Sequence, residues 1–374
     1  MLLEPTADQG FLRETTDKFL TKEATVADLR ALHHDARGFD RTYWQRGAEL
    51  GWTTLLVDEA HGGGSVSGRG LVDLTLLAYE FGRHAAPGPL LVSNVVASAL
   101  ASSGGRFDEA LAGIVKGTKV ATWAVEEGSS LDHVGLTVTP RGAEVIVTGA
   151  KRPVESAGQA DWILATGRTG EGLTQVLVPA GAAGLAVSPL HSADLTRRFA
   201  AVTFDSVRLP SSSVVGEIGG AGPDFHRQLM LGLALQAAEN VGAMHSGFEM
   251  TVEWAFDRYS FGRPLASYQA LKHRFADMKA WLEASHAVAD AAAAAIADLH
   301  PDAERLARAA KAYTGQQGSE LLQDCVQMHG GIGVTFEHDL HIFLRRLAVN
   351  RMLLGTPAEH YRKLGQAALR EEQP

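Results

Sequence analysis

The chain has 374 residues, which is enough for two or three domains or for one large core. Its 45% hydrophobic and 21% charged residues are typical of a globular protein. A formal net charge of −9 argues against nucleic acid as the main partner, because phosphate binding needs a basic face.

Three further features predict a cytoplasmic protein with no membrane partner. No apolar run approaches the roughly 20 residues that a membrane-spanning helix needs. Cys325 is the single cysteine, so an internal disulfide is excluded and a reducing compartment is favoured. Glu4 and Asp8 stand where a secretory signal would have basic residues and an apolar core.

The first part of the chain, to about residue 119, is predicted to be mostly helical. Apolar residues three and four positions apart indicate amphipathic helices, and Gly51 fits the end of one of them. The predicted helices cover residues 24–36, 40–52, 70–85, 90–104 and 106–117.

Between about residues 120 and 218 the pattern changes to short β-rich runs separated by glycine or proline. The runs lie at residues 119–127, 135–140, 143–154, 161–168, 173–180, 185–190 and 200–210. This spacing predicts a small antiparallel sheet domain or barrel.

From about residue 219 to the end, the sequence again predicts helices, and these are long. They cover residues 226–260, 277–300 and 302–331. An alanine run inside the second one favours a buried bundle helix, because alanine is the best helix former. Gly232 and Gly242 stand where neighbouring helices can pack closely. The order α, β, α indicates an α+β fold.

The stretch RYSFGRPLASYQALKHRFADM, residues 258–278, joins two of these helices. Arg258 offers a planar fork suited to phosphates. Phe261 offers a flat apolar face, and Gln269 offers amide donors and acceptors. Taken alone, the stretch is equally a helical turn with a surface arginine and a core phenylalanine.

The stretch QMHGGIGVTFEHD, residues 327–339, follows a long predicted helix. Its glycines either end the helix or allow a ligand close to the backbone, because glycine has no Cβ. His329, His338 and His341 match no usual zinc spacing, so we expect no metal there.

Together these two stretches strongly resemble the acyl-CoA dehydrogenase family of flavoproteins. ELGWTTLLVDEAHGG (residues 49–63) and GAKRPVESAGQADWILATGR (residues 149–168) are also similar to segments of that family, and the resemblance covers nearly the whole chain. It implies an N-terminal helical domain (1–119), a middle β-barrel or sheet domain (120–218) and a C-terminal four-helix bundle (219–374). It also implies FAD, an acyl-CoA substrate that undergoes α,β-dehydrogenation, and a homotetramer or dimer of dimers.

In the family, each FAD site is shared between two subunits. The resemblance implies that six intact residues of this chain reach the neighbour's cofactor: Arg258, Phe261, Gln269, Gln327, Gly330 and Gly331. The segments that would hold the chain's own flavin depart from the family. AVEEGSSLDH (residues 124–133) stands for Thr-Glu-Pro and Gly-Ser-Asp, and Pro153 to Glu155 stand for Trp-Ile-Thr. A buried Glu155 beside a flavin would be costly.

The family's catalytic base is also missing from its expected place. It is usually the glutamate before Gly-Thr, about ten residues after an Arg-Asp pair, and counting from Arg345 puts Leu354 there. Some relatives carry the base on the helix before R-x-x-F-G, and that position falls near Gly232. Glu239 is the nearest acid on that helix, and we expect it to be structural or an inter-helix partner. We therefore predict no catalytic residue.

The leading hypothesis is a subunit of a heterotetramer whose homologous partner is catalytically complete. Such heteromeric relatives act on bulky CoA esters, for example those of steroid degradation. Three alternatives stay open. The first is a self-sufficient homo-oligomeric dehydrogenase with a non-standard base, the second is a flavin-dependent monooxygenase on the same fold, and the third is a structural or regulatory relative.

Overall fold

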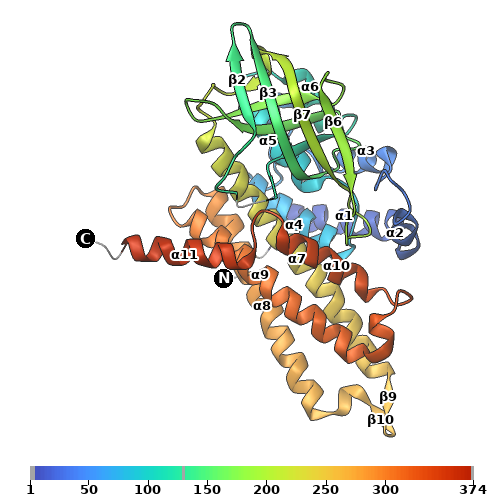
Figure 1. Cartoon of the computed structure of the whole chain (residues 1–374). Helices are drawn as coiled ribbons and strands as arrows, with labels where there is room; N and C mark the ends of the chain where they lie inside the picture. Colours follow the sequence, from blue (N-terminus) through green and yellow to red (C-terminus); the bar gives the residue numbers. More distant parts are fainter. Residues whose placement is uncertain (1–4, 129–130, 372–374) are drawn as a thin grey trace.

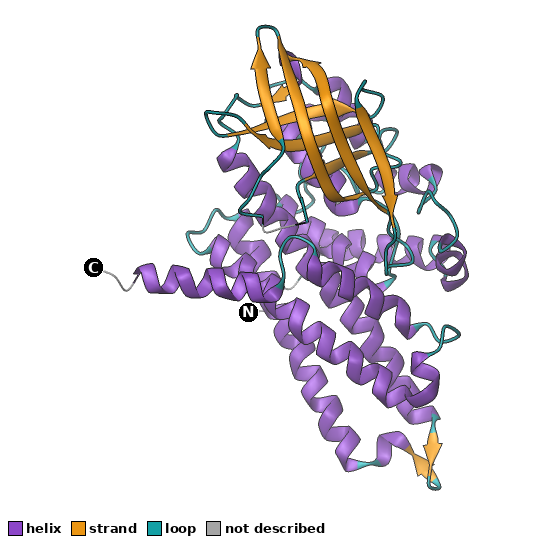
Figure 2. Ribbon diagram, viewed as in Figure 1, coloured by secondary structure: helices purple, strands orange, loops and turns teal. Residues whose placement is uncertain are grey.

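The computed structural model describes residues 5–128 and 131–371, and in it helices precede and follow a β sheet (Figure 1). Figure 2 shows the main sheet at one end of the molecule, with some of its strands crossing behind the others, and mostly helices in the rest. The predicted α+β fold is confirmed. Glu4, Ser129 and Ser130, which the sequence arguments used, lie outside the described residues.

Five of the six N-terminal helices overlap the predicted ranges, whereas the helix at Ala7–Glu23 was not predicted. Side-chain caps fix several of the helix starts. Thr6 and Thr25 each begin a helix with a capping box, and Asp40 accepts from two backbone N–H groups of the third. Gly51 has a φ of +96°, which ends that helix. The helices are α1 (Ala7–Glu23), α2 (Val26–Leu32), α3 (Arg41–Glu49), α4 (Gly70–Arg83), α5 (Leu90–Ala101) and α6 (Asp108–Val115).

All seven predicted β runs are strands of one eight-stranded sheet in the described residues. The strands are β1 (Ala121–Ala124), β2 (Thr137–Arg141), β3 (Glu144–Glu155), β4 (Trp162–Arg168), β5 (Leu173–Pro179), β6 (Leu185–Leu190), β7 (Phe199–Pro210) and β8 (Val214–Val215). Along the sheet their order is β6-β7-β3-β2-β4-β5-β8, and β1 pairs with β4.

The sheet is antiparallel at most of its strand pairs, as predicted, but two pairs are parallel. Strand β4 pairs in parallel with β1 and, at one position, with β2. The chain between β1 and β4 contains the β2–β3 hairpin, and a connection of that length permits parallel pairing. Strand β8 was not predicted because two residues give no periodic pattern.

The C-terminal part is a bundle of long helices. They are α7 (Gly222–Asp257), α8 (Gln269–Ala297), α9 (Ala303–His329), α10 (Leu340–Met352) and α11 (Pro357–Glu371). A hairpin of β9 (Tyr259–Ser260) and β10 (Arg263–Pro264) joins α7 to α8 at the far end of the bundle (Figure 1). None of the helices in residues 5–128 and 131–371 is long and apolar enough to cross a membrane.

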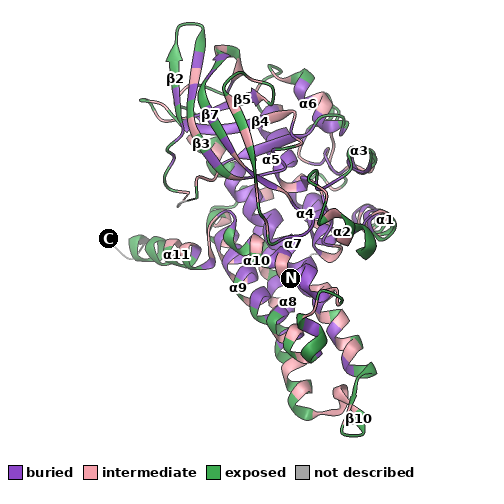
Figure 3. Ribbon diagram, turned by 45° about the vertical axis from the view of Figure 1, so that its right-hand side comes forward, coloured by how far each residue is buried: buried purple, intermediate pink, exposed green. Residues whose placement is uncertain are grey.

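The molecule has two hydrophobic cores. One lies inside the sheet, and the other is shared by the N-terminal and C-terminal helices, which pack on each other through α4 and α7. Figure 3 shows this second core as buried chain along α4, α5 and α7. We propose domain boundaries after residues 119 and 218, because these points fall between α6 and β1 and between β8 and α7.

Helices α4 and α7 cross in very close contact at two glycines. A Cβ on Gly242 would lie 2.0 Å from the carbonyl oxygen of Tyr79, and a Cβ on Gly82 would lie 1.9 Å from that of Glu239. Both obstacles are backbone atoms, so an alanine at either position must push the helices apart.

We expect Gly242→Ala to lower the free energy of unfolding by about 2 kcal/mol, as overpacking of a core does. Gly10→Ala is the matched control, because Gly10 is also helical and a Cβ there meets nothing within 4 Å. That control should gain roughly 0.5–1 kcal/mol from helix propensity. Urea unfolding followed by circular dichroism measures both, and equal shifts in the two variants would contradict the crossing.

Candidate functional site

The two positions at which the resemblance places the family's catalytic base lie against each other. Leu354 is 4% exposed and occupies the turn between α10 and α11, with a φ of +56°. Its Cδ1 atom lies 2.8 Å from the point where a Cβ of Gly232 would be, in the middle of α7. Gly232 therefore makes room for the leucine, and neither position offers a carboxylate.

A small cavity borders this turn on the side of the sheet. Its volume is about 30 Å³, and its lining includes Leu91, Trp123, Pro153, Gln236 and Leu354. A space of this size holds one or two water molecules. Pockets that bind cofactors or substrates are about 300–1,000 Å³, so a flavin ring does not fit here.

A buried ion pair fills part of the space between the sheet and the helices. Arg197 donates from Nε to Glu155 Oε1 at 2.9 Å and makes a second contact to Glu155 Oε2 through its NH2 group. Its NH1 group donates to Asn350 Oδ1 at 2.5 Å. Burial opposes the charge of Arg197, but Glu155 and Glu239 outweigh it and raise the pKa of the guanidinium. Glu155 is buried, and its carboxylate is paired with Arg197.

A second buried arginine ties three separate segments together. Arg346 of α10 donates from Nε to Asp194 Oδ2 at 2.5 Å and from NH1 to Glu239 Oε1 at 2.6 Å. Its NH2 group also donates to the carbonyl oxygens of Ala85 and Ala86, at 3.1 Å each. The expectation that Glu239 is an inter-helix partner is confirmed, because it joins α7 to α10.

The acid that sequence reasoning missed is Glu126. Its Oε1 accepts a hydrogen bond from the backbone N–H of Leu354 at 2.8 Å, and it lines the small cavity. Burial raises the pKa of Glu126 to about 7, against the hydrogen bond from Leu354, which lowers it. Burial also lowers the pKa of nearby Lys311 to about 7. Glu126 belongs to the segment AVEEG, whose departure from the family drew attention away from its acids.

The six residues predicted to reach a neighbour's cofactor are all exposed. Phe261 is the extreme case, being 98% exposed at the tip of the β9–β10 hairpin with a φ of +49°. It is therefore not a core phenylalanine, and Figure 3 shows this hairpin on the surface of the bundle.

The structure links Arg258 to the glycine turn through Trp254. The guanidinium of Arg258 lies 5.8 Å from the ring centre of Trp254, and that ring stacks on His329 at 5.3 Å. Within the described residues, no ion-pair partner of Arg258 is present. Gln327 and Gln269 are exposed on α9 and at the start of α8. Phe261 is not in contact with this group.

Gly331 carries a separate indication of an outside contact. Its φ lies outside the left-handed region, and a Cβ there would meet nothing within 4 Å. Gly330 differs, because its φ of +65° ends α9. Nothing within the described chain requires glycine at position 331, whereas a ligand or partner that approaches the backbone would.

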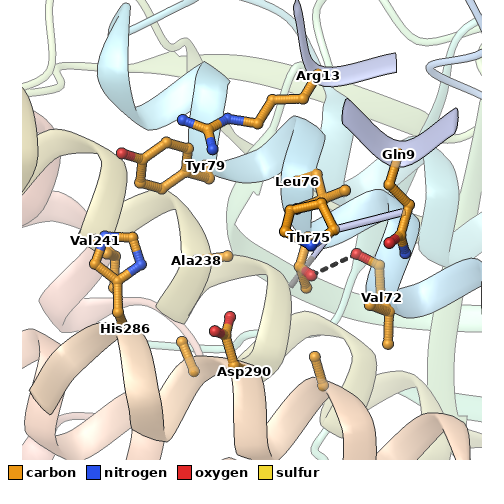
Figure 4. A pocket seen from close by; sticks show the side chains of 13 residues that line it. Gln9, Arg13, Val72, Thr75, Leu76, Tyr79, Ala238, Val241, His286 and Asp290 are labelled. Atoms are coloured by element: carbon orange, nitrogen blue, oxygen red, sulfur yellow. Dashed lines mark hydrogen bonds between the residues drawn. The ribbon is translucent and has the colours of Figure 1, made fainter. Parts of the chain in front are cut away.

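A second hollow lies on another face of α7, between that helix and α1, α4 and α8. Its volume is about 200 Å³, and Figure 4 shows Arg13, Tyr79, His286 and Asp290 around it. Burial raises the pKa of Asp290 to about 6 and lowers that of His286 to about 4. This hollow is separate from the Leu354 cavity.

Two family descriptions match the chain. Residues 6–106 match "Acyl-CoA dehydrogenase, N-terminal domain", and residues 224–369 match "Acyl-CoA dehydrogenase, C-terminal domain". The chain belongs to the acyl-CoA dehydrogenase family. Members are FAD-dependent oxidoreductases that act on acyl-CoA thioesters.

Individual relatives of this acyl-CoA dehydrogenase are similar over nearly their whole length. "Acyl-CoA dehydrogenase IpdE2" of Mycobacterium tuberculosis is 29% identical over 97% of this chain and 98% of its own. The solved structure of a variant of the "Tcur3481-Tcur3483 steroid ACAD" is 27% identical, with a TM-score of 0.89, over 98% of this chain and 99% of that one. "PigA with FAD and proline" shares the fold at 21% identity and a TM-score of 0.89, over 98% of this chain and 99% of that one.

Two places in this acyl-CoA dehydrogenase were expected to lie near FAD, and the residues present fit FAD in only one of them. The Leu354 cavity does not fit it, because about 30 Å³ and a buried ion pair leave no space for the ring system. The exposed set around Arg258 and Gly331 fits the phosphates and flat rings of a cofactor held by another subunit.

Proposed function

We propose that this chain is the subunit of a heteromeric acyl-CoA dehydrogenase that lacks its own base and completes the FAD site of a homologous partner. The observation that carries the proposal is the meeting of Leu354 and Gly232 beside a cavity of about 30 Å³. Leucine and glycine accept no proton, and a space of about 30 Å³ admits no cofactor. The partner would supply both the base and the cavity.

The exposed residues define what this chain would give to the partner. Arg258 presents its guanidinium to cofactor phosphates, and Phe261 presents an aromatic face to a flat ring. Gly331 lets the partner's cofactor approach the backbone closely. FAD, when bound, accepts the hydride of the dehydrogenation. The residues of this chain bind and orient it, which is the part of catalysis that depends on positioning.

The proposed substrate class is a bulky acyl-CoA, such as a steroid-derived thioester, in the cytoplasm. Support comes from the 27% identical structure, whose name gives two proteins and a steroid substrate class. The likeness covers 98% of this chain and 99% of that one.

The test is co-expression with a homologue that carries the Glu-Gly-Thr sequence. We expect the two chains to co-purify as a heterotetramer with about one FAD per two chains, and the complex to oxidise an acyl-CoA. A lone chain that holds one FAD per subunit and turns over would overturn the proposal. Flavin bleaching by acyl-CoA without oxygen separates dehydrogenation from a monooxygenase, which needs an external reductant.

We expect Arg258→Met to weaken FAD binding by the complex by roughly 10- to 100-fold. This is the loss expected when one hydrogen bond to a charged group, about 1.5–3 kcal/mol, is removed. Arg141→Met is the matched control, because Arg141 is equally an exposed arginine but ends β2, at the opposite end of the molecule (Figure 1). FAD loss on dilution, followed by fluorescence, measures the effect. Equal retention in both variants would remove Arg258 from the cofactor site.

One observation favours the self-sufficient enzyme as a second candidate. The carboxyl group of Glu126 lies next to Leu354 and has a pKa of about 7, which suits a general base near neutral pH. If Glu126 were the base, Glu126→Gln would abolish acyl-CoA oxidation. Under the leading proposal, the heteromer with Glu126→Gln keeps its activity.

A further inference from the structure

A cluster of possible metal ligands lies between α1 and α4, away from both sites described above. It consists of Asp17 on α1, and of Glu80 and His84 at the end of α4. One ligand atom of each residue lies within 4.8 Å of the others. Within the described residues, this is the one such group of three.

The local sequence places these atoms together. Glu80 and His84 are four residues apart, so they lie on the same face of α4. The C-terminal end of a helix carries partial negative charge and favours a cation. Asp17 projects from α1 to the same point, with its Oδ1 2.8 Å from His84 Nε2.

Glu80 has an oxygen that the protein leaves unsatisfied. The residue is 1% exposed, and its Oε1 accepts from Arg13 Nε at 2.6 Å. Its Oε2 is buried and has no hydrogen-bond partner. That oxygen lies 4.0 Å from His84 Nε2, on the side of the cluster. An unsatisfied buried carboxylate oxygen is costly, and a bound cation would satisfy it.

The position of Arg13 explains why only one carboxylate oxygen of Glu80 has a hydrogen-bond partner. Its guanidinium lies 4.9 Å from the ring centre of Tyr79, and Figure 4 shows it extended above that ring. The stacking holds Arg13 on one side of Glu80.

We propose that Asp17, Glu80 and His84 bind one divalent transition-metal ion of the zinc class, which pins α1 to α4. Two carboxylate oxygens and one imidazole nitrogen are a ligand set that Zn²⁺ accepts, with water in the fourth position. Zinc ligand atoms stand about 3.3 Å apart at bond lengths of roughly 2.0–2.2 Å. Separations of up to 4.8 Å must therefore shrink by up to about 1.5 Å, and the 2.8 Å between Asp17 Oδ1 and His84 Nε2 must widen by about 0.5 Å. Access is from the side of Asp17, whose side chain is 47% exposed.

The proposed metal site differs from a surface histidine that contacts exposed acidic side chains. His61 contacts Asp58 at 2.6 Å and Asp108 at 3.5 Å, but both acids are largely exposed and neither has a buried unsatisfied oxygen. This second cluster supplies the matched control, since it offers the same chemical groups without the buried ligand.

The experiment is titration of the metal-free full chain with Zn²⁺ by calorimetry and with Co²⁺ by visible absorption. We expect one equivalent per chain, the strong visible bands of four-coordinate Co²⁺, and a melting temperature that rises with the free Zn²⁺ concentration. His84→Ala and Asp17→Asn should each weaken binding by at least about tenfold, whereas His61→Ala should leave it unchanged.

Asp17→Asn keeps the Arg13–Glu80 pair intact, so it remains informative if Glu80→Gln fails to fold. The absence of saturable binding to the wild-type chain would overturn the proposal. So would binding that His84→Ala and Asp17→Asn leave unchanged, because the ion would then sit elsewhere. The site does not depend on the proposed function, and the heteromer can fail its test while the metal test succeeds.

Discussion

Arg346→Met is expected to lower the free energy of unfolding by about 3–5 kcal/mol, the cost of removing one partner from a buried ion pair. The side chain is 1% exposed and binds Asp194 and Glu239 at 2.5 and 2.6 Å. Methionine fills a similar volume but leaves Asp194 buried without its ion-pair partner, and leaves Glu239 with only the ion pair to Arg197, at 3.6 Å, among the described residues. Because Asp194 lies between β6 and β7, the loss loosens the sheet from the helices as well.

Arg345→Met is the control for this prediction. The neighbouring arginine is only partly buried and makes one contact of 3.3 Å to a carbonyl oxygen, so its loss should cost less than about 1 kcal/mol. The difference between the two variants should shrink at acid pH, where protonation discharges the carboxylates that lose Arg346. Denaturant unfolding at pH 7 and pH 4 measures both effects. If both substitutions lowered the free energy of unfolding by the same small amount, the contacts of Arg346 would not be what holds the sheet against the helices.

Glu126→Gln is expected to change the pH dependence of stability. The pKa of Glu126 is raised from 4.5 to about 7, so the folded state binds a proton that the unfolded state releases. Stability from this group is complete below pH 4.5 and falls as the pH rises to about 7, by roughly 3 kcal/mol at 1.36 kcal/mol per pKa unit. Glutamine still accepts from Leu354 N–H and carries no charge. The variant should therefore gain stability over wild type between pH 4.5 and pH 8.

The measurement is urea unfolding of both proteins at pH 4.5, 6 and 8. Glu144→Gln serves as the control, because Glu144 is exposed and its substitution should leave the pH profile unchanged. Lys311 acts in the opposite range. Its pKa is lowered to about 7, so it adds stability as the pH rises above 7 and complicates comparison only there. A wild-type profile parallel to that of Glu126→Gln would show that the carboxyl is not buried in its charged form.

Most of the helices and strands were predictable because their signals are local, although α1, α10, α11 and β8 were not among the predicted elements. The apolar spacing of residues 70–85 and the β-rich run of residues 173–180 report α4 and the buried strand β5 directly. The parallel pairing of β1 with β4 was not predictable, since no local pattern says which strands become neighbours. The same holds for the single core that the N-terminal and C-terminal helices share.

The absence of a catalytic carboxylate from the candidate site was predictable, but the residues that fill the space there were not. Counting along the family motif placed both Leu354 and Gly232, and the structure brings the two together. The contacts of Arg197 with Glu155 and of Arg346 with Asp194 join residues 42 and 152 positions apart, so sequence spacing could not reveal them. Glu126 was overlooked for the same reason, because its meaning depends on a turn more than 200 residues away.

The filled space beside Leu354 has a consequence for the history of the chain. A glutamate restored at position 354 would enter about 30 Å³ of free volume next to Glu126, and the Arg197–Glu155 pair would still occupy the region beside it. Restoring a carboxylate at position 354 and enlarging the cavity beside it require separate substitutions, and neither substitution restores the site without the other. Under the proposed function, the dependence on a partner is thus irreversible by any single substitution, and the two genes become committed to one another.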